Sequence, residues 1–303
     1  MEEWELKAYL KAGDIARRVK EEALRYVRPG MKLVNVCEHL EGLIRSLGGQ
    51  PAFPINISIN EVAAHRTALI SDDEVIPSDS VVKVDIGVHV DGFIADTAVT
   101  LCFNPAYDLL IEATKEALDS ALNSVKAGIR FSEVGKVIES IARRYGFRVV
   151  KNLSGHSLGR YLIHAGESIP NFYDRLNLRR FKSGAAYAIE PFLTKGFGYV
   201  KEGKLITIYS LKRTRIKGGL SSDEVKLLNV INERFKTLPF TERWLKDLGF
   251  EPSKLRELLR RLMKRGYLRG YPVLIEIASG VVAQFEDTIV IVDDNVVVTT
   301  RKL

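Results

Sequence analysis

The sequence predicts a mixed α/β protein of the α+β kind, with two similar halves and a helical insertion late in the chain. Alternating apolar and polar residues indicate strands, and apolar residues at a spacing of 3.6 indicate amphipathic helices. One helix-containing unit occurs twice, which indicates the two halves. A chain of 303 residues is long enough for one large domain with such an insertion.

The first 27 residues predict an amphipathic helix with acidic residues in its first turn. They lack the apolar core of a secretion signal, and no apolar run is long enough to span a membrane. Two cysteines, Cys37 and Cys102, are too few for a disulfide framework. We therefore expect reduced thiols, a cytoplasmic location and no membrane partner.

A repeat follows this helix. The segment Val27–Gly48 aligns without gaps on Val125–Gly146, an offset of 125 − 27 = 98 positions. Glycines match at Gly30 and Gly128, and apolar residues match along the helical face. Two unrelated amphipathic helices could also look alike. If the repeat is real, it predicts two similar α/β halves.

The segment VDIGVHVDGFIADTAVT predicts a β-hairpin, because apolar residues alternate on both sides of a Gly-containing loop. We place a four-residue loop at His89–Gly92, so that Val88 faces Phe93. In this register Asp85 and Asp96 lie directly opposite each other, with Cβ atoms about 5 Å apart. Two carboxylates so close repel unless a cation lies between them.

Three further metal-ligand candidates occur in the second half. His156 lies in a Gly/Ser-rich loop, and Glu190 and Glu286 each interrupt an apolar strand. A carboxylate in an apolar strand is costly to bury without a partner or a metal, although a structural salt bridge would explain any single one. Four carboxylates and one imidazole suit two divalent ions of Mn, Fe, Co or Zn, rather than calcium or a thiolate zinc site.

The later part of the chain predicts three short helices and then a strand. The helices run from Ser221/Ser222 to Phe235, from Thr241 to Lys246, and from Ser253 to Arg265. This pattern is typical of a winged-helix module. The stretch Glu251–Gly270 carries seven basic and two acidic residues, an excess of 7 − 2 = 5. This excess indicates either a solvated helix face or a surface that meets RNA.

Five segments carry a resemblance to a known family: PAFPINISINEVAAH, VDIGVHVDGFIADTAVT, NLSGHSLGRYLIHAG, YAIEPF and AQFEDT. In order and spacing the chain resembles the methionine aminopeptidases. The 286 − 190 = 96 positions between Glu190 and Glu286 resemble the type 2 enzymes of archaea and eukaryotes, which carry a helical insertion there. One departure is Asp287, where relatives often have His. We expect its side chain to face away from Glu286.

The resemblance implies the pita-bread aminopeptidase fold, in which helices cover an antiparallel sheet and two pseudo-symmetric halves hold the metals between them. It places the metallo-aminopeptidase domain at residues 1–199 and 271–303, and a winged-helix-like insertion at 200–270. The implied activity is removal of N-terminal methionine from nascent proteins and peptides when the second residue is small. A monomer is expected, with ribosomal RNA as a candidate contact of the basic insertion helix.

The resemblance also assigns roles to the site residues. Asp85 binds one ion alone, Asp96 and Glu286 bridge two ions, and His156 and Glu190 complete the second. A hydroxide shared by the ions attacks the peptide bond, with Glu190 as the proton shuttle. The remaining roles are implied for His164 at the substrate carbonyl, for His65 near the scissile nitrogen, and for a methionine pocket of Phe53, Ile163 and Tyr271.

Two other functions remain open at this point. Prolidases and aminopeptidase P share the five-ligand pattern, but they usually carry a domain ahead of the metal domain, and only 84 residues precede Asp85. A non-catalytic pita-bread binding protein would have lost its metal ligands. For the pocket residues, ordinary core packing is the alternative to a substrate contact.

Overall fold

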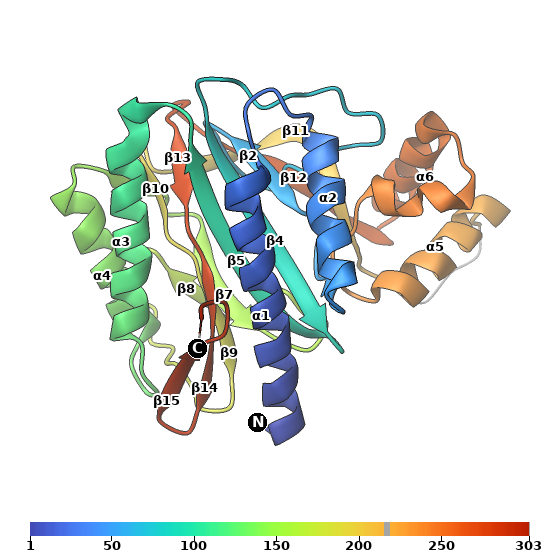
Figure 1. Cartoon of the computed structure of the whole chain (residues 1–303). Helices are drawn as coiled ribbons and strands as arrows, with labels where there is room; N and C mark the ends of the chain where they lie inside the picture. Colours follow the sequence, from blue (N-terminus) through green and yellow to red (C-terminus); the bar gives the residue numbers. More distant parts are fainter. Residues whose placement is uncertain (215–218, 303) are drawn as a thin grey trace.

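The computed structural model describes residues 1–214 and 219–302. A long hairpin of β4 (Val81–Val90) and β5 (Phe93–Cys102) runs through the middle of the molecule (Figure 1). Four helices lie on the same side of the sheets in this view: α1 (Glu3–Tyr26), α2 (Leu33–Ser46), α3 (Asp108–Ser124) and α4 (Phe131–Arg144). No helix in this described part combines the length and apolar character needed to cross a bilayer.

The remaining elements of the two halves are mostly short. They are β1 (Gln50–Pro51), β2 (Asn56–Ile59), β3 (Val62–Ala64), the 3₁₀ helix η1 (Pro105–Tyr107), β6 (Arg148–Val149), β7 (Ser154–Leu158), β8 (Ser168–Pro170), β9 (Ala186–Ile189), β10 (Phe192–Thr194), β11 (Val200–Leu211), β12 (Leu268–Glu276), β13 (Val282–Gln284), β14 (Asp287–Val292) and β15 (Asn295–Val298). The strands pair in the orders β1-β4-β2 with β5 on β4, β13-β10-β6, β11-β12-β3 and β15-β14-β9-β7-β8. Every paired strand in the described residues is antiparallel, as expected.

The predicted repeat is confirmed in detail. Helix α4 begins and ends 98 positions after α2, and β6 lies 98 positions after β1. Gly30 and Gly128 both have φ of +82°, a conformation that favours glycine. Each donates its N–H over 2.8 Å to a carbonyl, of Ile76 and of Phe181. The same turn therefore introduces the same helix in each half.

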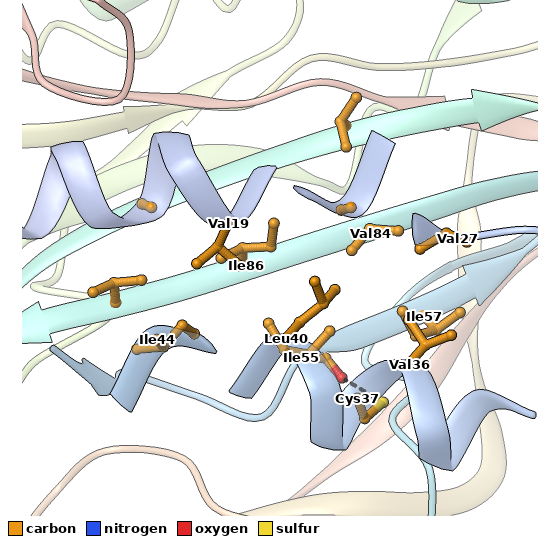
Figure 2. Close-up of a cluster of buried hydrophobic side chains, with 14 of the residues drawn as sticks. Val19, Val27, Val36, Cys37, Leu40, Ile44, Ile55, Ile57, Val84 and Ile86 are labelled. Carbon is orange, nitrogen blue, oxygen red and sulfur yellow. Dashed lines mark hydrogen bonds between the residues drawn. The ribbon is translucent and has the colours of Figure 1, made fainter. Parts of the chain in front are cut away.

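The first half has its own apolar core, in which α1 and α2 pack on β2 and β4 (Figure 2). Val19 of α1 and Leu40 of α2 are fully buried against Ile86 of β4. Cys37 also lies in this core as a free thiol, whose S–H donates to the Ile55 carbonyl over 3.5 Å. A second core of the same design holds α3 and α4 against β9, β10 and β14. The hairpin contributes to the first of these cores, through apolar residues of both β4 and β5.

The register predicted for the hairpin is wrong by two residues. Val90, not Val88, lies opposite Phe93, so the loop has two residues and not four. Both turn residues have positive φ, 52° at Asp91 and 90° at Gly92. An Asp-Gly pair with this geometry matches the twist of the two strands, and this favours the tighter turn. Since the slip is two residues, each side chain keeps its predicted face.

The insertion lies to the side of the two halves (Figure 1). It contains α5 (Ser222–Phe235), the 3₁₀ helix η2 (Glu242–Leu248) and α6 (Pro252–Lys264), which share an apolar core of their own. Ser221 caps α5 as predicted, but Ser253 does not cap α6. Pro252 occupies the first turn of α6, where its missing N–H costs nothing, so the helix begins one residue earlier.

Candidate metal centre

The hairpin brings two carboxylates to one face of the sheet. Asp96 lies opposite Gly87, and Asp85 lies opposite Ala98. The two aspartates are therefore diagonal neighbours, not the directly opposed pair that the sequence predicted. Gly87 is required here for packing, because a Cβ at this position would lie 2.2 Å from the Phe53 ring.

Glu286 reaches the same place from the far end of the sequence. Its N–H donates to the Ala98 carbonyl (3.1 Å), and the Ala98 N–H donates to the Glu286 carbonyl (3.2 Å). This bridge fixes the backbone of Glu286 beside β5. The next residue, Asp287, faces away from the cluster as expected, and its carboxylate lies 2.6 Å from both Lys20 Nζ and Arg301 Nε.

His156 lies on strand β7, not in the loop that its Gly- and Ser-rich surroundings predicted. The strand packs so tightly on β9 that a Cβ at Gly155 would lie 2.4 Å from the Ala188 carbonyl oxygen. Glu190 lies in the break between β9 and β10. The Asn171 side-chain amide donates to the Glu190 carbonyl (2.9 Å), and Gln284 Nε2 donates to Glu190 Oε1 (2.7 Å).

The predicted ligands come together in two overlapping sets. Asp96, His156 and Glu286 form one set, and Asp85, Glu190 and Glu286 form the other, with the ligand atoms of each set within 4.8 Å of one another. Within the part of the chain described, one buried oxygen of Asp85, Asp96 and Glu286 has no hydrogen-bond partner, and neither has His156 Nδ1. Such unsatisfied groups fit divalent cations, and the hard oxygen and nitrogen donors suit Mn, Fe, Co or Zn.

The electrostatics of the cluster lead to the same conclusion. Burial raises the pKa of Asp85 to about 7. Burial, followed by repulsion from the neighbouring carboxylates, raises the pKa of Asp96, Glu190 and Glu286 well above the ordinary value. In contrast, burial lowers the pKa of His156 to about 3, so its ring is neutral and able to act as a ligand. Cations would relieve the repulsion that these shifts report.

A cavity of about 430 Å³ opens directly over the cluster. All the predicted site residues line it except Glu286, which lies beneath, 1% exposed. Phe53 and Ile163 are buried in the apolar wall, and Tyr271 is half-buried. A cavity of this size, apolar on one side and acidic at its base, accepts a side chain next to a polar group.

Two histidines in the cavity have unusual surroundings. His65 has φ of +65°, an uncommon conformation for a residue with a side chain, and such strain is concentrated at functional sites. Its Nδ1 lies 3.2 Å from the Pro272 carbonyl oxygen, which only accepts, so Nδ1 carries the proton and Nε2 is left as an acceptor. His164 packs edge-on to His156, with ring centres 4.6 Å apart. Burial lowers the pKa of His164, and that of His65 to about 4.

Two polar residues of the site were not predicted from the sequence. Gln284 is buried and holds Glu190. Its position two residues before Glu286 gives it the same strand periodicity, which is a usable signal in an apolar segment. Arg269 lines the cavity but had been counted only as part of a basic stretch. The other two histidines are structural: His39 stacks on Tyr26, and His89 Nδ1 accepts from the Gly92 N–H.

Comparison with known proteins extends this description. Residues 7–293 match the model of metallopeptidase family M24. The methionine aminopeptidase of Saccharolobus solfataricus is 47% identical over 303 residues, covering 100% of both chains. The methionine aminopeptidase of Pyrococcus abyssi is 45% identical over 292 residues, covering 96% of this chain and 98% of that protein.

Solved structures share the fold at lower identity. A methionine aminopeptidase from Thermotoga maritima superposes with a TM-score of 0.72 at 20% identity, covering 100% of this chain and 98% of that chain. A thermophilic Arx1 gives a TM-score of 0.84 at 17% identity, covering 99% of this chain and 91% of that chain. The prolidase from Pyrococcus furiosus gives 0.64 at 17% identity, covering all of this chain but only 65% of that one. These three likenesses establish the pita-bread fold alone.

Proposed function

The chain belongs to metallopeptidase family M24, and on this premise we propose that it removes N-terminal methionine from peptides and nascent proteins. One observation carries the proposal: four carboxylates and a histidine gather at the base of a cavity of about 430 Å³ with a partly apolar wall. The cluster offers too few hydrogen-bond partners for its own oxygens and is suited to divalent cations.

We assign the ligands as Asp85, Asp96, His156, Glu190 and Glu286, and two ions of Co, Mn, Fe or Zn as the cofactors. Glu286 belongs to both sets of ligand atoms, which supports a bridging role. Divalent ions at such a site act as Lewis acids and make water a stronger nucleophile near neutral pH. Asp96 is the second bridging candidate, with an oxygen 3.7 Å from His156 Nε2.

The remaining site residues handle the substrate. Glu190 is held at Oε1 by Gln284, which orients its carboxylate as the group that takes and returns a proton. The neutral Nε2 of His65 accepts a hydrogen bond from a peptide N–H. His164 lies beside His156 and donates to the substrate carbonyl, where negative charge develops. Phe53, Ile163 and Tyr271 enclose the methionine side chain.

Selection for a small second residue follows from this enclosure. The residue after methionine must lie beside His65, whose backbone is fixed and whose ring meets Tyr271 edge-on at 5.5 Å. A bulky side chain there would collide before the scissile carbonyl reached the carboxylates at the base of the cavity. Peptides beginning Met-Gly, Met-Ala, Met-Ser or Met-Val are therefore expected to be cut, and peptides beginning Met-Glu are not.

We also assign the chain to the type 2 subgroup, with the insertion at residues 200–270. The separate apolar core of α5, η2 and α6 supports this division. A monomer in the cytoplasm is the expected form.

A contact with ribosomal RNA through α6 is a narrower proposal, because four basic side chains already pair with acids of the insertion: Lys254, Arg256, Arg261 and Arg265. Arg260 and Lys264 are left to meet phosphate.

The test is release of free methionine from Met-Ala-Ser by purified protein supplied with each candidate metal. Xaa-Pro peptides in parallel would reveal a prolidase or aminopeptidase P activity. Turnover of neither peptide with every metal, while the protein remains folded, would favour a non-catalytic binding protein and would contradict the proposal.

A further inference from the structure

Among the residues that line the cavity, Arg269 has a position that the proposed chemistry does not use. It lies on β12 two residues before Tyr271, so both side chains share one face of the strand. Its guanidinium carbon lies 5.0 Å from the centre of the Tyr271 ring. Arg269 is exposed whereas Tyr271 is half-buried, so β12 runs inward from the mouth of the cavity.

No acidic side chain among the described residues neutralises the charge of Arg269. Within residues 1–214 and 219–302 it has neither a hydrogen-bond nor an ion-pair partner. Glu167, the other charged residue at the rim, is paired with Lys182 at 3.1 Å. Burial has the largest effect on the pKa of both His65 and His164, and Arg269 lowers both further, so its field reaches into the cavity.

The cavity therefore has a direction, with carboxylates at its base and an unpaired cation at its mouth. A peptide enters with its amino end first, and its second residue lies beside His65. The His65 and Tyr271 ring centres lie 5.5 Å apart, and the Arg269 guanidinium carbon lies 5.0 Å from the Tyr271 ring centre, so Arg269 is no farther from the His65 ring than the sum of these distances. Since an extended chain advances roughly 3.3–3.6 Å per residue, this limit spans at most about three residues after the second, and the third and fourth residues lie within reach of Arg269.

We propose that Arg269 binds a carboxylate at the third or fourth residue of the substrate, so that acidic sequences directly after the small second residue are preferred. The inference rests on the proposed function. A planar guanidinium presents paired N–H donors that match a carboxylate. The carboxylate has two possible sources: an Asp or Glu side chain, or the free carboxyl end of a tripeptide or tetrapeptide.

The experiment compares kcat/KM for Met-Ala-Asp-Gly, Met-Ala-Asn-Gly and Met-Ala-Lys-Gly, all as C-terminal amides, and for Met-Ala-Gly as free acid and as amide. The first three peptides report a side-chain carboxylate, and the last pair reports the chain end. An exposed ion pair is worth up to about a fivefold change in affinity. We therefore expect kcat/KM for the Asp peptide to exceed that for the Asn peptide by about twofold to fivefold. The gain should appear in KM and not in kcat, because the contact is made equally before and during reaction.

Variants of Arg269 give the decisive comparison. Arg269→Met keeps the apolar stem over Tyr271 and should abolish the preference, whereas Arg269→Glu should reverse it in favour of Lys. Lys204→Met, which removes an exposed cation from the neighbouring strand β11, is the matched control and should keep the wild-type preference. Added salt should weaken the preference in the wild type.

If the ratio of kcat/KM for the Asp and Lys peptides is the same in the wild type and in Arg269→Met, this inference is wrong while the proposed function still stands. A changed pH profile with an unchanged ratio would assign Arg269 to the histidines and would also overturn it. If the wild type cleaves none of these peptides with any metal, the proposed function itself is wrong. These results separate the two claims.

Discussion

Glu41 and Arg243 form a two-pronged ion pair, with each side chain 2% exposed. The two oxygens of Glu41 lie 2.7 and 2.9 Å from two guanidinium nitrogens. Glu41 lies on α2 of the first half and Arg243 on η2 of the insertion, so the pair joins the two units. Trp244 Nε1 also donates to Glu41, over 2.7 Å. Removing one partner would leave a buried charge without compensation.

We therefore expect Glu41→Ala to lower the free energy of unfolding by about 3–5 kcal/mol. Urea denaturation at pH 7 measures the change. The control is Glu38→Ala, one turn earlier on the same helix, whose exposed pair with Lys246 is 3.2 Å long and worth about 0–1 kcal/mol. Similar losses in the two variants would mean that the buried pair contributes no more than a surface pair.

The two carboxylates that we assign as bridging ligands should be essential. Asp96→Asn or Glu286→Gln is expected to abolish turnover of Met-Ala-Ser and to reduce the metal bound per chain, because each change removes charge from a cluster built for cations. Activity and metal content are measured on the same sample. Asp287→Asn, next in sequence but facing Lys20, serves as the control and should keep both. Near-normal activity in either ligand variant would contradict the two-ion assignment.

The two cavity histidines should behave differently from the ligands. Alanine at His65 or His164 is expected to leave the metal content unchanged and to lower kcat on the order of 100-fold, the usual cost of one lost transition-state contact. Steady-state kinetics and metal analysis together test this. Loss of metal along with activity in the His164 variant would show that this residue is a ligand, like its neighbour His156.

Glu276 should make stability depend on pH. Burial alone would raise the pKa of this carboxyl, but four backbone N–H groups hold it below the ordinary value. They belong to Phe197, Gly198, Ala278 and Gly280, at 2.6–3.0 Å. A depressed pKa gives stability that is present above the unfolded-state value, about 4.3, and is lost as pH falls towards the folded-state value.

Glu276→Gln should therefore be less stable than wild type at pH 7, with a difference that shrinks below about pH 4. Denaturant unfolding at several pH values measures this difference. Glu202→Gln, at an exposed position of β11, is the control and should show little difference at any pH. If the loss of unfolding free energy in Glu276→Gln stays constant down to pH 3, ionisation of the carboxyl is not its cause.

Local patterns in the sequence predicted most of the fold. Period-two alternation found the hairpin, and the gapless repeat found the two equivalent helices. The register failed because the Asp91-Gly92 turn was read as part of a longer loop. His156 was assigned to a loop because its glycine neighbour looked like a turn signal, whereas Gly155 is there for close strand packing. Composition alone cannot distinguish these two uses of glycine.

The sequence predicted the candidate ligands that the structure brings together, but not the residues that support them. Asp85 and Asp96 kept their shared face because a two-residue slip preserves side-chain direction. Gln284 had a local signal in its period-two spacing from Glu286, but its contact with Glu190, the place of Arg269 at the cavity and the Glu41–Arg243 pair bring together residues far apart in sequence, and no local pattern reports these. For the same reason the sequence could not reveal which basic residues of α6 are already paired.

The backbone bridge between Ala98 and Glu286 joins two residues that are synthesised at very different times. Asp85 leaves the ribosome 286 − 85 = 201 residues before Glu286 does. At translation speeds of about 5–20 residues per second, this interval lasts roughly 10–40 s. Throughout it the growing chain lacks a ligand common to both sets. With Glu286 as the proposed shared ligand, a product truncated before it would carry an incomplete centre, and peptidase activity would begin only when synthesis is nearly finished.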